Sequence, residues 1–223
     1  MIVRMALDFI SPYAFLGWRR ARRELVSSEI QLEPMPVLFA ALLNANETKG
    51  PAEIPSKRLY TWKHVLRLAH GQGLVIAPPP SHPFNPLLGL RVVACTMSDD
   101  DRVRTIDALF DATWGGGGGI ATPQAVLTCL NAAGLPGEAL VEQASDPAIK
   151  QQIKDNTTLA LALGVFGVPS FIVNDEVFWG QDSLPHLAAY LKGEDPVDPK
   201  ALQRWADLPV GAARVGATGA KPG

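Results

Sequence analysis

The sequence has very few cysteines. Only Cys95 and Cys129 occur among its 223 residues, and they do not form a Cys-x-x-Cys pair. No group of His and Cys has the spacing of a zinc site. A dithiol redox centre and a zinc finger are therefore excluded, and we expect no metal. Both cysteines fall in apolar segments, so we predict reduced, buried thiols that act as small hydrophobic side chains.

The sequence also lacks a strong excess of charge and a long apolar run. Its formal net charge is −2, which gives no general attraction to nucleic acid or to anionic lipid. No apolar run is long enough for a membrane span, and the first ten residues do not have the features of a signal peptide. We therefore expect a cytoplasmic protein without nucleic-acid or membrane partners. Its hydrophobic content of 47% is ample for a buried core.

Apolar patterning divides the chain into three parts. The N-terminal part reads as a strand from residue 2 to 9, a helix that begins after Ser11-Pro12, and a second strand near residues 30–39. Residues 39–163 have mostly helical spacing. After Gly164 the pattern returns to two strands, joined by a turn at Asn174-Asp175, and to a closing helix with Asp182 or Ser183 as its cap.

The simplest assembly of these parts is an α/β protein with one sheet, whose halves are separated in sequence by an inserted all-helical domain. The sheet domain would comprise residues 1–38 and 164–192, and the insertion residues 39–163. Residues 193–223 would form a C-terminal extension, whose last stretch, 211–223, is expected not to order. A ligand site is expected where the sheet and the insertion meet.

Ser11 lies at the junction of the first strand and the first helix, and two interpretations are open. Serine is a favoured helix N-cap, and proline is favoured directly after it. The same position offers a hydroxyl at a helix N-terminus, where unpaired N–H groups stabilise negative charge. A serine nucleophile would need a partnered histidine, and none of the four histidines lies near Ser11 in the sequence.

The layout is that of a thioredoxin-like fold with a large helical insertion, and four motifs add detail. "DFISPYAFL" at 8–16, "EIPSKRLY" at 53–60, "GVFGVPSFIV" at 164–173 and "FWGQDSL" at 178–184 together resemble the 2-hydroxychromene-2-carboxylate isomerase family. That family is related to kappa-class glutathione transferases and more distantly to DsbA-like oxidoreductases. The resemblance covers residues 2–192. Where DsbA-like relatives begin a Cys-x-x-Cys, this chain has Ser11-Pro12-Tyr13-Ala14.

The resemblance implies glutathione as the source of sulfur, and it implies the residues that hold it. A free thiol has a pKa of about 8.5 and is mostly protonated at neutral pH. Ser11 is implied as the catalytic residue, donating a hydrogen bond to the glutathione thiolate. Pro169 is expected to follow a cis peptide bond, so that the Val168 backbone pairs with the cysteinyl part. Gln181 and Asp182 are implied to hold the γ-glutamyl end, and Lys57 a carboxylate.

The motifs specify the other contacts to glutathione and to the second substrate less closely. Relatives carry an asparagine upstream of "EIPSKRLY", where this chain has Thr48, and Asn44 or Asn46 could substitute if the loop shifts. The candidates for binding a small aromatic substrate are aromatic or polar residues of the helical part: Tyr60, Trp62, Phe84, Asn85 and Trp114. Relatives are commonly dimers, so a homodimer is expected.

The reaction implied is glutathione-dependent isomerisation of a 2-hydroxychromene-2-carboxylate-type compound from aromatic hydrocarbon catabolism. Thiolate addition to an electrophilic carbon, rotation about the resulting single bond and elimination would interconvert the isomers. Two alternatives stay open. One is a kappa-like glutathione transferase that uses the same half-site for conjugation. The other is a glutathione-binding protein without catalysis, which would not perturb the thiol pKa.

Overall fold

The computed structural model describes residues 1–212. The chain divides into two units, residues 1–188 and 189–223. The predicted disorder of 211–223 concerns residues that lie almost entirely outside the described part. The predicted domain boundaries at 38/39 and 163/164 stay a prediction.

The first unit is built on one sheet of four strands, whose order is β2-β1-β3-β4. Strands β1 (Ile2–Leu7) and β2 (Gln31–Pro36) pair in parallel. Strand β3 (Ser170–Val173) pairs antiparallel with β1 and with β4 (Glu176–Trp179). All four predicted strands are confirmed. β2 contains two prolines, which lack an N–H, and it tolerates them because it lies at the sheet edge.

The turn between β3 and β4 has the predicted residues. Asn174 and Asp175 have φ angles of 49° and 65°. Two successive residues with positive φ are typical of a type I′ turn, whose twist matches that of the strands it joins. The hairpin that follows the Val168-Pro169 loop is therefore specified by its local sequence.

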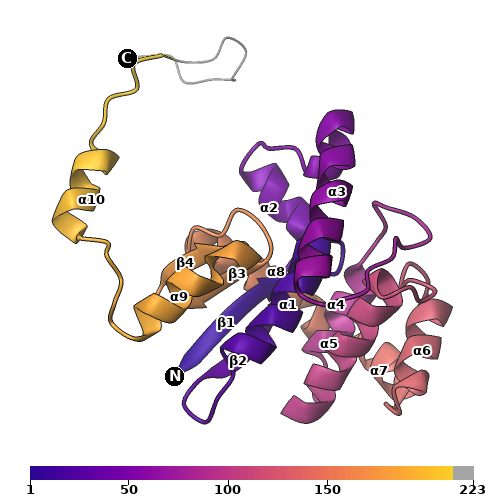
Figure 1. The fold of residues 1–223 in the computed structure, drawn as a ribbon. Coiled ribbons are helices and arrows are strands. Elements are labelled where there is room, and N and C mark those ends of the chain that lie inside the picture. Colours follow the sequence, from indigo (N-terminus) through magenta and orange to yellow (C-terminus); the bar gives the residue numbers. More distant parts are fainter. Residues whose placement is uncertain (213–223) are drawn as a thin grey trace. The chain divides into compact units, whose positions relative to one another are not determined.

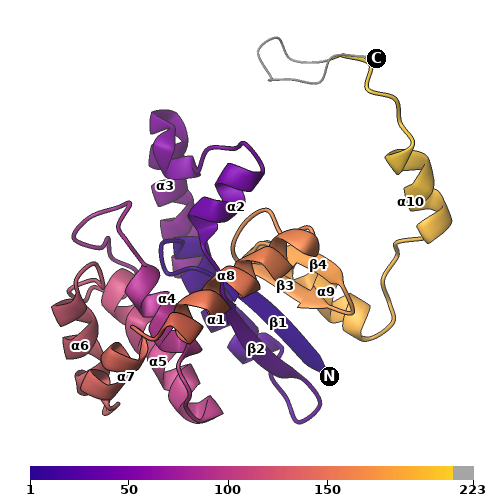
Figure 2. The same cartoon turned by 180° about the vertical axis from the view of Figure 1, so that it is seen from behind.

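Two helices cover the opposite faces of the sheet (Figures 1 and 2). Helix α1 (Pro12–Glu24) lies on one face and α8 (Pro147–Ala162) on the other. α1 buries Phe15, Leu16 and Trp18. On the α8 side, Ala160 shares a core with residues of β1, β2 and β3: Ala6, Met35 and Ile172. The last helix of the predicted insertion thus packs directly on the sheet.

The rest of the predicted helical region is confirmed as helical. Its helices are α2 (Phe39–Ala45), α3 (Pro55–Gly71), α4 (Leu87–Ala94), α5 (Asp99–Trp114), α6 (Pro123–Ala132) and α7 (Gly137–Gln143), with a 3-10 turn η1 at Pro51–Glu53. α5 is tied to α1 because Asp107 accepts a hydrogen bond from Trp18 Nε1 at 2.8 Å and pairs with Arg19 and Arg22.

The two cysteines are free thiols, as predicted. Cys95 is buried directly after α4, and its Sγ–H donates to the Leu140 carbonyl at 3.6 Å. Cys129, on α6, is only half-buried, so the prediction that both are buried was wrong for this residue. Burial raises the pKa of each thiol to about 11, which keeps both protonated and unreactive near neutral pH.

Helix α9 (Leu184–Leu191) spans the boundary between the two units. The described part of the second unit also contains α10 (Pro199–Ala206), which the sequence patterning did not predict. Asp198 caps α10 by accepting from the Lys200 N–H at 3.0 Å, and the Asp-Pro pair at 198–199 was the signal that could have revealed it. Across residues 1–212, no helix combines the length and apolarity that crossing a bilayer requires.

Candidate functional site

Ser11 is the N-cap of α1 and also faces the loop before β3. Its Oγ accepts from the Ala14 N–H at 3.2 Å and donates to the Val168 carbonyl oxygen at 3.2 Å. The residue is only 7% exposed. Helix geometry leaves the Tyr13 N–H without an intrahelical partner. The two interpretations of Ser11 are therefore compatible, since one hydroxyl caps the helix and contacts a second element.

The peptide bond between Val168 and Pro169 is cis, as predicted. Gly17 allows the proline to lie directly on α1, because a Cβ at Gly17 would come within 2.9 Å of Pro169 Cγ. The Val168 carbonyl accepts from Ser11, while the Val168 N–H has no hydrogen-bond partner within residues 1–212. This N–H is available for a strand-like contact with a ligand.

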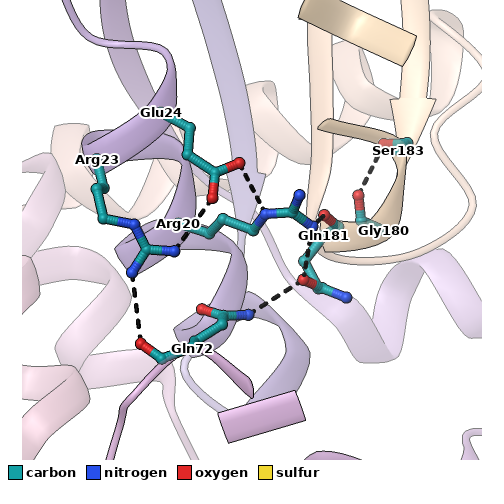
Figure 3. Close-up of polar contacts among 7 residues, drawn as sticks. All are labelled: Arg20, Arg23, Glu24, Gln72, Gly180, Gln181 and Ser183. Carbon is teal, nitrogen blue, oxygen red and sulfur yellow. Dashed lines mark hydrogen bonds and ion pairs between the residues drawn. The ribbon is translucent and has the colours of Figure 1, made fainter. Parts of the chain in front are cut away.

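Gln181 and Asp182 lie in a 3-10 turn, η2 (Gln181–Ser183). Hydrogen bonds from α1 and α3 hold this turn in place (Figure 3). Gln181 is 5% exposed, and its backbone and side-chain oxygens both accept from Arg20. Gln72 donates to the same side-chain oxygen. Gly180 takes the cap position of this 3-10 turn with φ of 88°, and Ser183 Oγ donates to the Gly180 carbonyl. The predicted cap of the closing helix by Asp182 or Ser183 stays a prediction.

Tyr13, in the first turn of α1, contacts α3. Its hydroxyl lies 3.0 Å from His64 Nδ1 and is also hydrogen-bonded to Thr61. Burial raises the pKa of Tyr13; the charges of Tyr60 and Asp182 raise it further, and the bond to Thr61 lowers it. The carboxylate of Asp182 is thus close enough for its field to reach the Tyr13 hydroxyl, and the Asp182 side chain itself is exposed. Sequence reasoning missed both Tyr13 and His64.

Ser11, Val168, Pro169 and Gln181 are brought together around the first turns of α1. Lys57 lies apart from them in the first turn of α3, with its side chain exposed. The loop that could replace the family's asparagine is also exposed, and Asn46 Nδ2 donates to the Leu42 carbonyl at 2.8 Å. Neither Thr48 nor Asn44 makes a side-chain hydrogen bond among the described residues. The structure thus leaves the predicted contacts of Lys57 and this loop as predictions.

Three of the five aromatic-substrate candidates gather around His82, a residue that the sequence did not single out. The His82 ring centroid lies 5.0 Å from that of Trp62, 5.6 Å from Trp114 and 6.3 Å from Phe84. Trp114 is only 2% exposed, and its Nε1 donates to the Phe9 carbonyl at 2.9 Å. Trp62 and Phe84 are half-buried, so they present the accessible part of this aromatic cluster.

The other two candidates do not join the aromatic cluster. Tyr60 is 61% exposed and packs against His64, with 5.7 Å between ring centroids. Asn85 is exposed, and its Oδ1 accepts from the Leu87 N–H at 3.0 Å, a contact that supports the start of α4. The helical spacing of these residues could not reveal this division, because it depends on the path of the loop before α4.

His82 contacts the segment that precedes Ser11. Its Nε2 lies 3.0 Å from the Ile10 carbonyl oxygen, an acceptor, so Nε2 carries the proton. Burial lowers the pKa of His82, and the charge of Arg58 lowers it further, while the bond to Ile10 raises it. His82 is therefore a neutral ring that anchors the Phe9-Ile10 segment to the aromatic cluster.

Asp8 is a buried carboxyl group that also holds the Phe9-Ile10 segment in place. Its Oδ1 accepts from the Ile10 N–H and its Oδ2 from the Phe39 N–H, each at 3.0 Å. The Asp8 carbonyl accepts from the Ser11 N–H at 3.1 Å. Burial raises the pKa of Asp8 to about 6, although its two N–H contacts lower it. The position of an acidic residue at the end of an apolar strand was the signal available in the sequence.

Asp8→Asn is expected to change how stability depends on pH. Because the folded-state pKa of about 6 lies above the ordinary value of 3.8, the folded state binds this proton more tightly. The contribution of Asp8 is therefore fully present below pH of about 4, is lost as pH rises to about 6, and then stays constant. Between pH of about 4 and 6, the free energy of unfolding of wild type, measured with urea, should fall by about 3 kcal/mol relative to that of Asp8→Asn. A constant difference between the two proteins would contradict this expectation.

A family model described as a DsbA-like thioredoxin domain matches residues 2–192. The chain belongs to this DsbA-like thioredoxin family. A 2-hydroxychromene-2-carboxylate isomerase of Sphingobium xenophagum is 27% identical over 188 residues, covering 82% of this chain and 94% of the relative. Human glutathione S-transferase kappa 1 is 25% identical over 211 residues, covering 88% of this chain and 93% of the relative. The resemblance found in the sequence motifs is confirmed.

Solved structures confirm the thioredoxin-like fold. A 2-hydroxychromene-2-carboxylate isomerase superposes with a TM-score of 0.75 at 21% identity, covering 93% of this chain and 98% of the other. The cytosolic disulfide reductase DsbM of Pseudomonas aeruginosa, solved with glutathione, has a TM-score of 0.58 at 15% identity and covers 93% of this chain and 100% of the other. Within residues 1–212, no group of three or more His, Cys, Asp or Glu side chains could hold a metal ion.

Proposed function

We propose that this protein is a glutathione-dependent enzyme of the isomerase and transferase type, and more specifically an isomerase of a 2-hydroxychromene-2-carboxylate-type aromatic compound. The observation that carries the proposal is the Ser11 hydroxyl at the N-terminus of α1, directly against the Val168-Pro169 loop. The family's redox position holds a serine here, so thiol chemistry at this position would take its sulfur from a small thiol. Curated relatives named as isomerases and glutathione transferases support this choice.

The residues around Ser11 fit glutathione as a co-substrate. The Tyr13 N–H and the helix N-terminus favour a thiolate. The Val168 N–H can pair with the cysteinyl backbone, and the Gln181 amide nitrogen can donate to the γ-glutamyl carboxylate. Asp182, being exposed, can accept from the γ-glutamyl ammonium. Lys57 is the proposed partner of a second carboxylate, reached from the first turn of α3.

Bound in this way, glutathione supplies a reversible nucleophile that can add to a conjugated carbon and leave again. Ser11 would donate a hydrogen bond from its hydroxyl to the thiolate. In this structure the hydroxyl donates to the neutral Val168 carbonyl instead. A charged acceptor makes a hydrogen bond roughly twice as strong, so rotation of the hydroxyl toward a thiolate is favoured. The half-buried Trp62 and Phe84 would hold the aromatic ring and exclude water beside it.

Binding is tested by titrating glutathione and following the ultraviolet absorbance of its thiolate against pH. We expect the pKa of the bound thiol to fall by about 1–2 units below its free value of about 8.5, as thiols do at helix N-termini. Binding with an unchanged thiol pKa would favour a glutathione-binding protein without catalysis. The absence of binding at millimolar glutathione would refute the proposal.

A kappa-like transferase is the second candidate, supported by the match to human glutathione S-transferase kappa 1 over 211 residues. Parallel assays separate the two activities. One follows isomerisation of 2-hydroxychromene-2-carboxylate, and the other follows conjugation of 1-chloro-2,4-dinitrobenzene. Glutathione-dependent isomerisation that exceeds conjugation supports the isomerase, whereas rapid conjugation without isomerisation supports the transferase. A homodimer and a cytoplasmic location also remain proposals.

A further inference from the structure

The 3-10 turn η2 is held by a polar network from two helices, α1 and α3 (Figure 3). Arg20 lies in the middle of α1 and is not part of its cap. Its Nη1 donates to the Gln181 backbone oxygen at 3.0 Å and to the Gln181 side-chain Oε1 at 3.3 Å. One guanidinium thus fixes both the backbone and the side chain of the same residue.

Gln72 completes the arrangement from the end of α3. It occupies the C-cap position of that helix, and its Nε2 donates to Gln181 Oε1 at 3.1 Å. Oε1 of Gln181 therefore accepts two hydrogen bonds, which occupy both of its lone pairs. The plane of the amide is fixed, and its nitrogen must point away from both donors, as Figure 3 shows.

The amide nitrogen of Gln181 is thereby left for an external acceptor. It makes no hydrogen bond to another residue of 1–212, and it is not among the buried atoms that lack a partner, so solvent reaches it. The neighbouring Asp182 side chain is exposed. Successive residues of one turn thus offer two amide hydrogens and a carboxylate, a combination that complements a group bearing both an anionic carboxylate and an ammonium.

Arg20 is itself held in place by Glu24. Arg20 Nε donates to Glu24 Oε2 at 2.8 Å, and Arg23 Nη2 donates to Glu24 Oε1 at 3.1 Å. Glu24 partly neutralises Arg20, so the role of Arg20 at the turn is directional and does not depend on an unpaired positive charge. Arg23 shares Glu24 and donates to the Gln72 carbonyl at 3.5 Å, so it belongs to the same network. Arg104 on α5 instead pairs with Asp101 of its own helix at 2.7 Å, which makes it a matched control outside the network.

We propose that Arg20 and Gln72 are positioning residues that set the Gln181 amide and so give the site its selectivity for thiols with a free α-amino-acid end. This deepens the proposed function and rests on it. Without Arg20, Gln181 loses a donor to each of its oxygens, and the amide can rotate so that its oxygen faces the ligand carboxylate. Affinity would then fall for glutathione but not for a thiol that lacks the γ-glutamyl group.

The test compares calorimetric Kd values for glutathione and for the dipeptide Cys-Gly, which lacks that group. In Arg20→Met, glutathione affinity should fall at least about tenfold, the loss typical of a hydrogen bond to a charged group. Cys-Gly affinity should change less than about twofold, and Arg104→Met should preserve the ratio of the two affinities. Arg20→Lys should restore the ratio only in part, because an ammonium lacks the planar fork of donors. An unchanged ratio in a folded Arg20→Met protein would overturn the inference.

Hydrogen exchange provides a readout that needs no ligand. Amides of residues 180–183 should exchange faster in Arg20→Met than in wild type, and at the wild-type rate in Arg104→Met. Equal exchange in all three proteins would refute the positioning role. If wild-type protein binds neither thiol, the proposed function and the selectivity both fail, while the exchange data still decide whether Arg20 fixes the turn. Loss of affinity for both thiols alike, with unchanged Tm, would also contradict selectivity.

Discussion

Ser11→Ala is expected to lower glutathione-dependent turnover by about 100-fold or more, comparable to the loss of an oxyanion donor in other enzymes. Ser11 Oγ faces the Val168-Pro169 loop and donates a hydrogen bond to the Val168 carbonyl at 3.2 Å. Alanine removes this donor, so the thiolate keeps only the helix N-terminus and backbone N–H groups. The measurement is kcat for isomerisation of 2-hydroxychromene-2-carboxylate, with 1-chloro-2,4-dinitrobenzene conjugation in parallel.

The loss of a helix cap must be separated from the loss of a catalytic donor. Removing the Ser11 cap alone should cost about 1 kcal/mol of stability. Ser98→Ala is a matched control, because Ser98 Oγ caps α5 by accepting from the Asp101 N–H at 3.1 Å. We expect similar destabilisation from both variants but near wild-type turnover from Ser98→Ala. Full activity in Ser11→Ala would show that the hydroxyl only caps the helix.

Trp114→Ala is expected to destabilise the protein by about 3–5 kcal/mol, the range for removing a large buried aromatic side chain. The sequence made Trp114 a candidate for substrate binding, but the side chain is 2% exposed. Its Nε1 donates to the Phe9 carbonyl at 2.9 Å, and its ring packs against Trp62 and His82. The substitution would leave a cavity and an unpaired carbonyl two residues before Ser11. Urea unfolding measures the loss.

Two further variants decide between a core role and a contact role for Trp114. Trp114→Phe keeps most of the ring but loses the N–H donor, so it should cost about 1 kcal/mol. Trp205→Ala, on α10, removes a tryptophan that is 71% exposed and should change stability by less than about 0.5 kcal/mol. A Trp114→Ala protein with wild-type stability and a selective rise in KM for the aromatic substrate would instead make Trp114 a substrate contact.

The network at Gln181 explains why sequence motifs locate a site better than they orient it. The motif "FWGQDSL" placed Gln181 correctly at the turn before α9. It could not show that the side-chain oxygen faces inward, because its donors, Arg20 and Gln72, lie 161 and 109 residues away in sequence. The same limit applies to His82, whose contact with Ile10 depends on the path of the loop before α4.

The sequence by itself determined the secondary structure that carries the site, and it excluded dithiol redox chemistry. Apolar spacing, the Ser11-Pro12 start of α1 and the Asn174-Asp175 turn are local signals, and the absence of a Cys-x-x-Cys pair is plain in the residues. Tertiary structure alone decided which side chains face one another. It buried Trp114, brought the side chains of Asp8 and His82 to the Ile10 backbone, and turned Gln181 toward Arg20. Side-chain direction follows packing and hydrogen bonds between distant segments, and no local pattern encodes those contacts.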